Sequence, residues 1–148
     1  MQYIKELSQY HSDRDSAVTF GKFDGLHRGH QKLVRKVQEL STNENVNSIV
    51  CAFDMHPLWK EKGITPQLIM DQRERYLHLE TQVDVLIDYP FTPEFARMPA
   101  EDFIEQIISR RLHARYVVVG TDFRFGYEKR GDVQMLSEYA GQYGYQLF

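Results

Sequence analysis

The sequence is poor in cysteine and has no long apolar run. Cys51 is the one cysteine among 148 residues, so no disulfide can form within the chain. A reducing environment is therefore expected, and the apolar neighbours of Cys51 favour a buried strand residue. No segment approaches the roughly 18 apolar residues that a membrane-spanning helix needs, and residues 1–16 lack the apolar stretch of a signal peptide. These absences predict a soluble, cytoplasmic protein with no membrane partner.

Positive charge is not in excess. The chain has 18 Lys and Arg against 21 Asp and Glu, a net charge of −3. A nucleic-acid interface needs a basic face, so no nucleic-acid partner is expected, although a small anionic ligand needs only a few local groups. Hydrophobic residues make up 42% of the chain and charged residues 26%, which is typical of a globular protein. The length suggests one domain, residues 1–148, with its own core.

Two common phosphate-binding motifs, G-x-x-x-x-G-K-[ST] and G-x-G-x-x-G, are absent. The segment GKFDGLHRGH, residues 21–30, follows an apolar run instead. His27 and His30 are three residues apart and share a face if a helix begins near them. Gly29 leaves backbone N–H groups bare at that helix end, and Gly21 and Gly25 permit the preceding turn. Two imidazoles beside bare N–H groups predict a pocket for a polyphosphate.

Two other interpretations of this segment remain open. Asp24, His27 and His30 form a donor set that suits zinc or iron, but a metal site would leave the glycines without a purpose. A purely structural turn is possible for any one of these residues and improbable for the whole set. We therefore predict phosphate binding and no protein metal ligand.

Strand-like and helix-like segments alternate along the chain. Four apolar runs have strand length, and a fifth begins near the end: Ala17–Phe20, Ser48–Phe53, Val83–Ile87 (stopped by Pro90), Tyr116–Val119 and Tyr145–Phe148. Four helices are predicted between them. The first has Leu33, Val34, Val37 and Leu40 at helical spacing, and the second opens on a capping box of Asp71 and Glu74 and continues through Leu77 and Leu79. The third runs from Pro99 to Arg110 and Arg111, and the fourth runs from Asp132 through Leu136 and Tyr143 to Gly144. The alternation predicts an α/β fold, a parallel sheet with helices on both faces.

The third of these helices has the clearest apolar face, formed by Phe103, Ile104, Ile107 and Ile108. In parallel sheets, ligands bind beyond the carboxyl ends of the strands. The unusual segments fall there: GKFDGLHRGH, DMHPLWKEKG and GTDFRFGYEKRGD each follow a predicted strand. His27, His30 and His56 are expected in these loops.

Taken together, these segments resemble a known family. His27-Arg28-Gly29-His30 matches the H-x-G-H signature of the nucleotidyltransferase superfamily. With FDMHP, PFTPEFARMPAEDFI and VVVGTDFRFGYEKRGD, the chain resembles, over nearly its whole length, the FMN adenylyltransferase (FAD synthetase) module of bacterial bifunctional riboflavin kinase/FAD synthetases. The resemblance implies a Rossmann-like fold and the transfer of AMP from ATP to FMN, with Mg²⁺ present, giving FAD and pyrophosphate.

The resemblance also implies roles for individual residues. His27 and His30 would be catalytic, holding the ATP phosphates. Residues shaping the nucleotide loop would be Gly21, Lys22, Phe23, Asp24 and Gly29. Residues on the flavin side would be His56, Pro57, Asp122, Phe123, Phe125 and Gly126. From the residues alone, Phe123 and Phe125 are equally compatible with core packing; Asp122 would accept from the N–H edge of the flavin ring, and Arg124 and Arg130 would meet a phosphate unless they are only surface charges.

The chain departs from the family pattern in three places. Lys22 stands where asparagine is more common, and Met55 stands where proline is usual. A later segment rich in Ser, Thr and Arg and a riboflavin kinase domain are not present, so a domain truncated at its C-terminal end and of weak activity is expected. Two alternatives stay open: an adenylyl- or cytidylyltransferase acting on another phosphorylated acceptor, and a flavin- or nucleotide-binding module without turnover.

Overall fold

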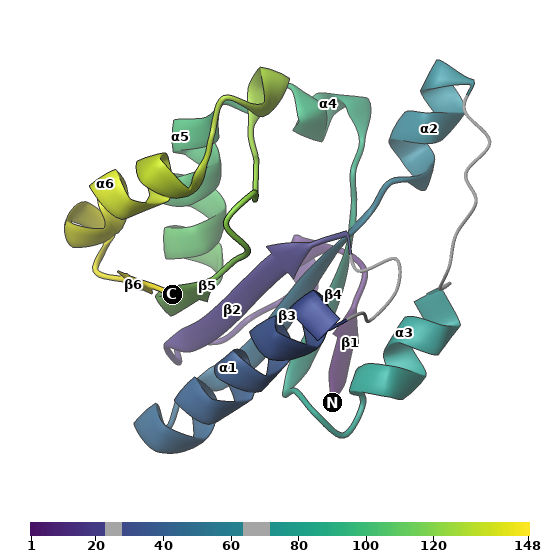
Figure 1. Cartoon of the computed structure of the whole chain (residues 1–148). Helices are drawn as coiled ribbons and strands as arrows, with labels where there is room; N and C mark the ends of the chain where they lie inside the picture. Colours follow the sequence, from purple (N-terminus) through teal and green to yellow (C-terminus); the bar gives the residue numbers. More distant parts are fainter. Residues whose placement is uncertain (23–27, 64–71) are drawn as a thin grey trace.

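A parallel β-sheet forms the centre of the protein (Figure 1). The structure is a computed structural model, and it describes residues 1–22, 28–63 and 72–148. Within these residues the sheet has six strands in the order β1-β4-β3-β2-β5-β6, and every neighbouring pair is parallel. The strands are β1 (Gln2–Ile4), β2 (Ser16–Gly21), β3 (Asn47–Asp54), β4 (Val85–Pro90), β5 (Ala114–Val118) and β6 (Gln146–Leu147).

Helices cover both faces of the sheet, which confirms the predicted fold class. The helical segments of the described residues are η1 (Leu7–Gln9), α1 (Arg28–Glu44), α2 (His56–Lys62), α3 (Gln72–Leu79), α4 (Pro93–Ala96), α5 (Ala100–Asp102), the π-helical η2 (Phe103–Arg111), η3 (Tyr127–Lys129) and α6 (Val133–Tyr143). α1 and α3 pack on one face. η2 and α6 pack on the other, where the largest buried cluster lies.

β2 shows why the central strands have no polar face. Ala17 packs in the cluster beneath α1, whereas Val18 and Phe20 point into the cluster beneath η2. All three side chains are buried because successive residues of a strand point to opposite faces and both faces are covered. The mainly apolar sequences of β2, β3 and β5 follow from this double burial.

The helix predicted from Pro99 to Arg111 is present, but its details differ. Pro99 is the N-cap residue rather than the first helical residue, and the segment from Phe103 onward is π-helical. The predicted apolar face is confirmed, because Phe103, Ile104, Ile107 and Ile108 are all buried. A π-turn shifts each hydrogen bond by one residue and still leaves these four side chains against the sheet.

The last helix follows its predicted signals. The Asp132 carboxylate accepts a hydrogen bond from the Met135 N–H at 2.8 Å, and Gly144 ends α6 with φ of +72°. In the predicted capping box before α3, Asp71 lies outside the described residues, and α3 continues through Leu77 to Leu79 as expected. β6 is confirmed as a short strand within Tyr145–Phe148.

Some predicted boundaries and segments were wrong, and one strand was not predicted. β4 begins at Val85 rather than Val83 and includes Pro90, which pairs with the last residue of β3. A proline fits there because it only removes one donor at the end of the strand. The segment after β3 was expected to be a loop, but it forms α2 from His56 onward. β1 had no signal in the sequence, and it is extended because it pairs with β4.

Two leucines on helices should separate core packing from surface packing. Leu136 in α6 is completely buried, whereas Leu77 in α3 is 54% exposed. Leu136→Ala should lower the free energy of unfolding by about 2–5 kcal/mol, because it leaves a cavity in the core. Leu77→Ala should change it by less than about 0.5 kcal/mol. Urea denaturation of both variants tests this, and equal effects would contradict the burial assigned to Leu136.

Candidate functional site

The carboxyl ends of the four longest strands lie at one edge of the sheet. Gly21, the last residue of β2, pairs in register with Ala52 of β3, and Asp54 of β3 pairs with Pro90 of β4. This edge is where parallel sheets bind their ligands. The segments singled out in the sequence, after β2, β3 and β5, all begin here.

The two-histidine segment spans the junction from β2 to α1. α1 begins at Arg28, so the prediction that a helix starts near the histidines is confirmed. Gly29 and His30 are the second and third residues of α1, and His30 is half-buried. Lys22 follows β2 and is exposed. The predicted residues Phe23, Asp24, Gly25 and His27 lie outside the described residues.

The segment after β3 positions Met55, His56 and Pro57. Met55 is the N-cap residue of α2 and is buried in the main core cluster, so the side chain that replaces the usual proline packs with apolar neighbours. His56 and Pro57 form the first turn of α2, which corrects the expectation of a loop histidine. Pro57 suits this position because its missing N–H has no helical partner in a first turn.

The two phenylalanines of GTDFRFG have different environments. Phe125 is only 6% exposed and packs on Phe103, with ring centroids 5.1 Å apart. Phe123 is half-buried and stacks nearly parallel to Phe125, at 5.6 Å and 21°. Its ring also lies nearly parallel to that of Phe20, at 6.2 Å and 22°. Of the pair, Phe123 therefore has the accessible ring, and Phe125 belongs to the core.

Further aromatic residues at this edge were not identified from the sequence. Phe53 at the end of β3 contacts Phe91 and Phe95, with centroid distances of 5.7 and 5.9 Å. Tyr89 and Phe95 lie 4.5 Å apart. We call Phe20, Phe53, Tyr89, Phe91, Phe95, Phe103, Phe123 and Phe125 the aromatic cluster. A signal was present in the sequence: three of these rings lie in YPFTPEF, which begins two residues after the apolar run Val83–Ile87.

The charged residues of the GTDFRFG segment lie at the surface. Asp122 is exposed. The Arg124 guanidinium lies 3.9 Å from the Asp132 carboxylate, and the Arg130 guanidinium lies 2.7 Å from the Glu128 carboxylate. Exposed ion pairs of this kind contribute little free energy, so neither arginine is prevented from meeting a phosphate.

A buried carboxylate near the same edge was also missed. Asp88 of β4 is 1% exposed and accepts a hydrogen bond from the Tyr3 hydroxyl of β1. It points to the face covered by α1 and α3, in register with Ala52. Burial raises the pKa of the neighbouring Cys51 thiol, and the Asp88 charge raises it further. Burial also raises the pKa of the Tyr89 phenol.

Among the described residues, no group of three His, Cys, Asp or Glu side chains has the arrangement of a metal site. The alternative of a metal held by Asp24, His27 and His30 involves residues outside the described ranges. Of the helices that the structure describes, none has the length and apolar character needed to cross a bilayer.

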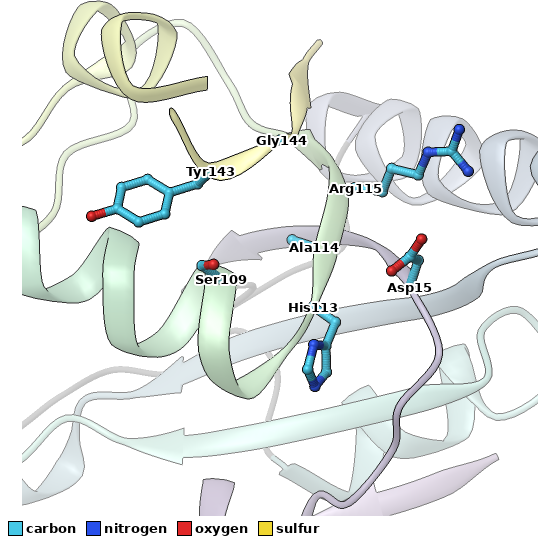
Figure 2. A pocket seen from close by; sticks show the side chains of 7 residues that line it. All are labelled: Asp15, Ser109, His113, Ala114, Arg115, Tyr143 and Gly144. Atoms are coloured by element: carbon cyan, nitrogen blue, oxygen red, sulfur yellow. The ribbon is translucent and has the colours of Figure 1, made fainter. Parts of the chain in front are cut away.

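A polar pocket of about 260 Å³ lies at the opposite end of the strands (Figure 2). It is formed where β2 and β5 begin and where η2 and α6 end, and it is lined by Asp15, Ser109, His113, Ala114, Arg115, Tyr143 and Gly144. Its lining is mostly polar and it is wide open to solvent, whereas ligand pockets are mostly apolar and enclosing. None of the residues that the sequence predicts for the functional site lines this pocket.

Comparisons with known proteins agree with the geometry. A family model described as FAD synthetase matches residues 9–148. The bifunctional riboflavin kinase/FMN adenylyltransferase of Escherichia coli K12 is 32% identical over 97% of this chain and 46% of its own length. That of Buchnera aphidicola from Acyrthosiphon pisum is 32% identical over 97% and 45%. The FAD synthetase of Listeria monocytogenes is 30% identical over 93% and 56%.

A crystal structure described as a macrolide-efflux protein from Streptococcus pneumoniae has the same fold. Its TM-score is 0.80 at 26% identity, covering 99% of this chain and 48% of that one. The chain thus spans about half the length of the relatives it matches. The fold is of the Rossmann-like nucleotidyltransferase class. Within that class, the chain belongs to the FAD synthetase family.

The buried Cys51 thiol should be chemically inert in the folded protein. Alkylation requires the thiolate, and both burial and the Asp88 carboxylate raise the pKa of this thiol. Iodoacetamide at mildly alkaline pH should leave the native protein unmodified and should label it fully in denaturing guanidinium chloride. Mass spectrometry over time measures this. Rapid labelling without denaturant would show that Cys51 is accessible.

Proposed function

We propose that this chain forms the FMN adenylyltransferase unit of a FAD synthetase, transferring AMP from ATP to FMN. The family match over residues 9–148 carries the proposal. The names of the relatives, FMN adenylyltransferase and FAD synthetase, give the reaction and imply ATP and FMN as substrates. The arrangement at the carboxyl edge supports it, because β2 ends there at Gly21, α1 begins after it at Arg28, and the aromatic cluster lies at the same edge.

The reaction is a direct in-line transfer. A phosphate oxygen of FMN attacks the α-phosphorus of ATP, the bond from that phosphorus to the bridging oxygen breaks, and pyrophosphate leaves with the electron pair. Such transfers depend on positioning and on stabilising negative charge. His27 and His30 would donate hydrogen bonds to the phosphates, next to the backbone N–H groups of the α1 amino terminus. Lys22, Phe23, Asp24 and Gly29 would shape the nucleotide loop.

Mg²⁺ is proposed to enter with ATP. When bound, it would neutralise phosphate charge and help to orient the leaving pyrophosphate. The described residues contain no three-ligand metal group. The ion would be held mainly by the nucleotide phosphates and water, as Mg²⁺ usually is.

The flavin is proposed to lie on the aromatic side of the site. Phe123 offers a half-buried ring that lies nearly parallel to the rings of Phe20 and Phe125, and its exposed part suits a planar isoalloxazine. Asp122 would accept from the N–H edge of that ring. His56 and Pro57, at the start of α2, would close the far side, and Gly126 would hold the turn of the flavin segment.

FAD formation tests the function directly. The protein is incubated with FMN, ATP and Mg²⁺, and the products are separated by chromatography. FAD and pyrophosphate are expected as products. His30→Ala should lower turnover by about 10²–10³-fold, which is the usual effect of removing one hydrogen-bond donor to the charge that develops in a transition state. The matched control is His11→Ala, because His11 is exposed and lies before β2; it should leave turnover unchanged.

Two outcomes would contradict this. A transfer of AMP or CMP to another phosphorylated acceptor, with no FAD from FMN, would overturn the flavin assignment. Normal turnover by His30→Ala would remove that histidine from the phosphate site.

Phe123→Ala should weaken FMN binding far more than ATP binding. Loss of the stacked ring is expected to raise the dissociation constant of FMN by about tenfold, the equivalent of 1.4 kcal/mol. Isothermal titration with each ligand separately measures the two constants. Phe148→Ala removes another accessible ring, 45% exposed after β6, and should change neither constant. Equal loss of FMN and ATP affinity would contradict the role of Phe123.

A further inference from the structure

We propose that Gly131 is a positioning residue for the flavin site: its missing side chain leaves the space in which the Phe125 ring supports Phe123. The inference rests on the proposed function for its ligand, a planar isoalloxazine. It assigns a function to a residue outside the GTDFRFG segment, because Gly131 comes five residues after Gly126, the last residue of that segment.

Gly131 and Phe125 are held together by their backbones. They form an isolated antiparallel bridge with two hydrogen bonds, from the Phe125 N–H to the Gly131 carbonyl at 3.2 Å and from the Gly131 N–H to the Phe125 carbonyl at 2.8 Å. The residues between them form the short turn η3. The two residues therefore cannot separate without breaking both bonds.

The Phe125 ring occupies the space where a side chain of residue 131 would be. A Cβ atom built on Gly131 would lie 2.5–2.6 Å from three ring carbons of Phe125, Cδ2, Cε2 and Cζ. Carbon atoms in contact lie roughly 3.5–4.0 Å apart, so any side chain at this position must displace the ring. The backbone of Gly131 is not in the left-handed region. Glycine is therefore required for space rather than for backbone conformation.

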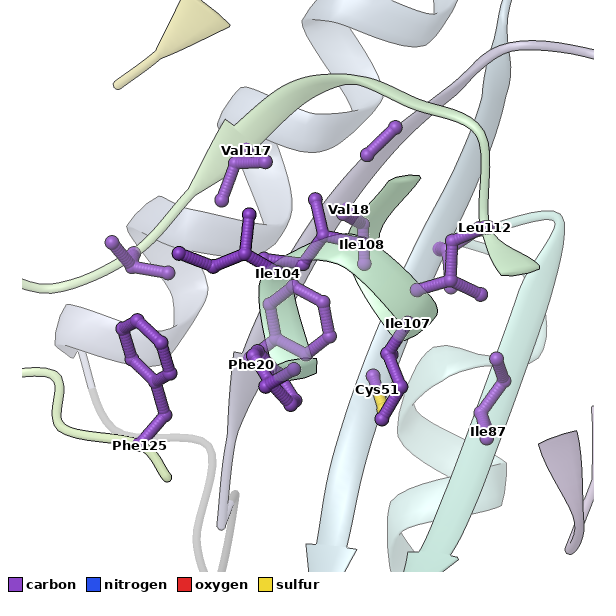
Figure 3. Close-up of a cluster of buried hydrophobic side chains, with 14 of the residues drawn as sticks. Val18, Phe20, Cys51, Ile87, Ile104, Ile107, Ile108, Leu112, Val117 and Phe125 are labelled. Atoms are coloured by element: carbon purple, nitrogen blue, oxygen red, sulfur yellow. The ribbon is translucent and has the colours of Figure 1, made fainter. Parts of the chain in front are cut away.

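The ring has little freedom to move away. Phe103 packs against it with ring centroids 5.1 Å apart, and Phe125 itself is a member of the buried cluster beneath η2 (Figure 3). The next residue, Gly126, has φ of +80° and lies so close to Ala100 that an added Cβ would be 2.6 Å from the Ala100 Cα. The Tyr127 N–H also donates to the Met98 carbonyl at 2.8 Å. These contacts fix the segment on the start of α5.

The displacement would therefore be transmitted to Phe123. The Phe123 ring is nearly parallel to the Phe125 ring, with centroids 5.6 Å apart. It is also nearly parallel to the Phe20 ring, with centroids 6.2 Å apart. Moving Phe125 removes its stacking contact with Phe123 and therefore changes the tilt of the Phe123 ring. A planar ligand that stacks on Phe123 would lose contact, whereas a ligand held by the α1 amino terminus would not.

The test compares two glycine-to-alanine variants. Gly131→Ala should raise the dissociation constant of FMN at least tenfold, with less quenching of flavin fluorescence in the complex, and should change that of ATP less than twofold. Gly141→Ala is the matched control, since Gly141 lies in α6 with nothing within 4 Å of an added Cβ. Binding is measured below the melting transition of each variant. The Phe123 ring proton shifts, measured by NMR without ligand, should move only in Gly131→Ala.

Unchanged FMN affinity and unchanged Phe123 shifts in a folded Gly131→Ala variant would overturn the positioning role. If that variant does not fold, Phe125→Leu replaces it, because leucine keeps the segment apolar and lacks the outer ring atoms; wild-type FMN affinity in Phe125→Leu would likewise overturn the role. A wild-type protein that binds no FMN would overturn the proposed function instead, and the Phe123 shifts would still decide whether Gly131 positions that ring.

Discussion

Parallel pairing of β2 with β3 on one side and β5 on the other determines the rest of the molecule. Parallel neighbours cannot be joined by a tight turn, so each connection must return across the sheet before the next strand begins. The returning segments become the helices that cover both faces. The carboxyl ends of the strands consequently meet at one edge, and the residues that follow them are brought together although they are far apart in the sequence.

The candidate site combines two different kinds of surface at that edge. On the α1 side, β2 ends in Gly21 and the helix starts soon afterwards, so backbone N–H groups and positive potential are concentrated near His30. On the η2 side, the same strand carries Phe20, which stacks with Phe123. The two proposed ligand groups, a phosphate and a planar ring, make opposite demands on a protein, and the neighbouring residues Phe20 and Gly21 of β2 would serve one demand each.

Much of the fold was predictable, and the exceptions have physical causes. β2, β3 and β5 are mainly apolar because both faces of the sheet are covered there, and α6 carries its capping residue and its terminal glycine in the sequence. β1 has three residues and becomes a strand only by pairing with β4, which no local pattern encodes. The π-helical hydrogen bonding of η2 could not be predicted either, because the same apolar face is compatible with an α-helix and with a π-helix.

For the candidate site, the sequence predicted which segments follow the strands but not which of their side chains are buried. The glycines, histidines and phenylalanines could be assigned to the carboxyl edge from their places after strands. Phe123 and Phe125 could not be distinguished, since only the packing of Phe103 and Gly131 decides which ring is accessible. Asp88 was missed because a polar residue near the end of an apolar run gives no sign that a tyrosine from another strand will bind it.

The strand order also has a consequence for how the chain folds. β1 precedes the other described strands along the chain, yet its neighbour β4 lies more than half the chain length further along. β2 and β3, by contrast, follow one another closely and pair directly. Contacts between distant segments form slowly because a large loop must be closed first. β1 is therefore synthesised before β4 but is expected to pair late, and we expect the sheet to grow outward from β2 and β3.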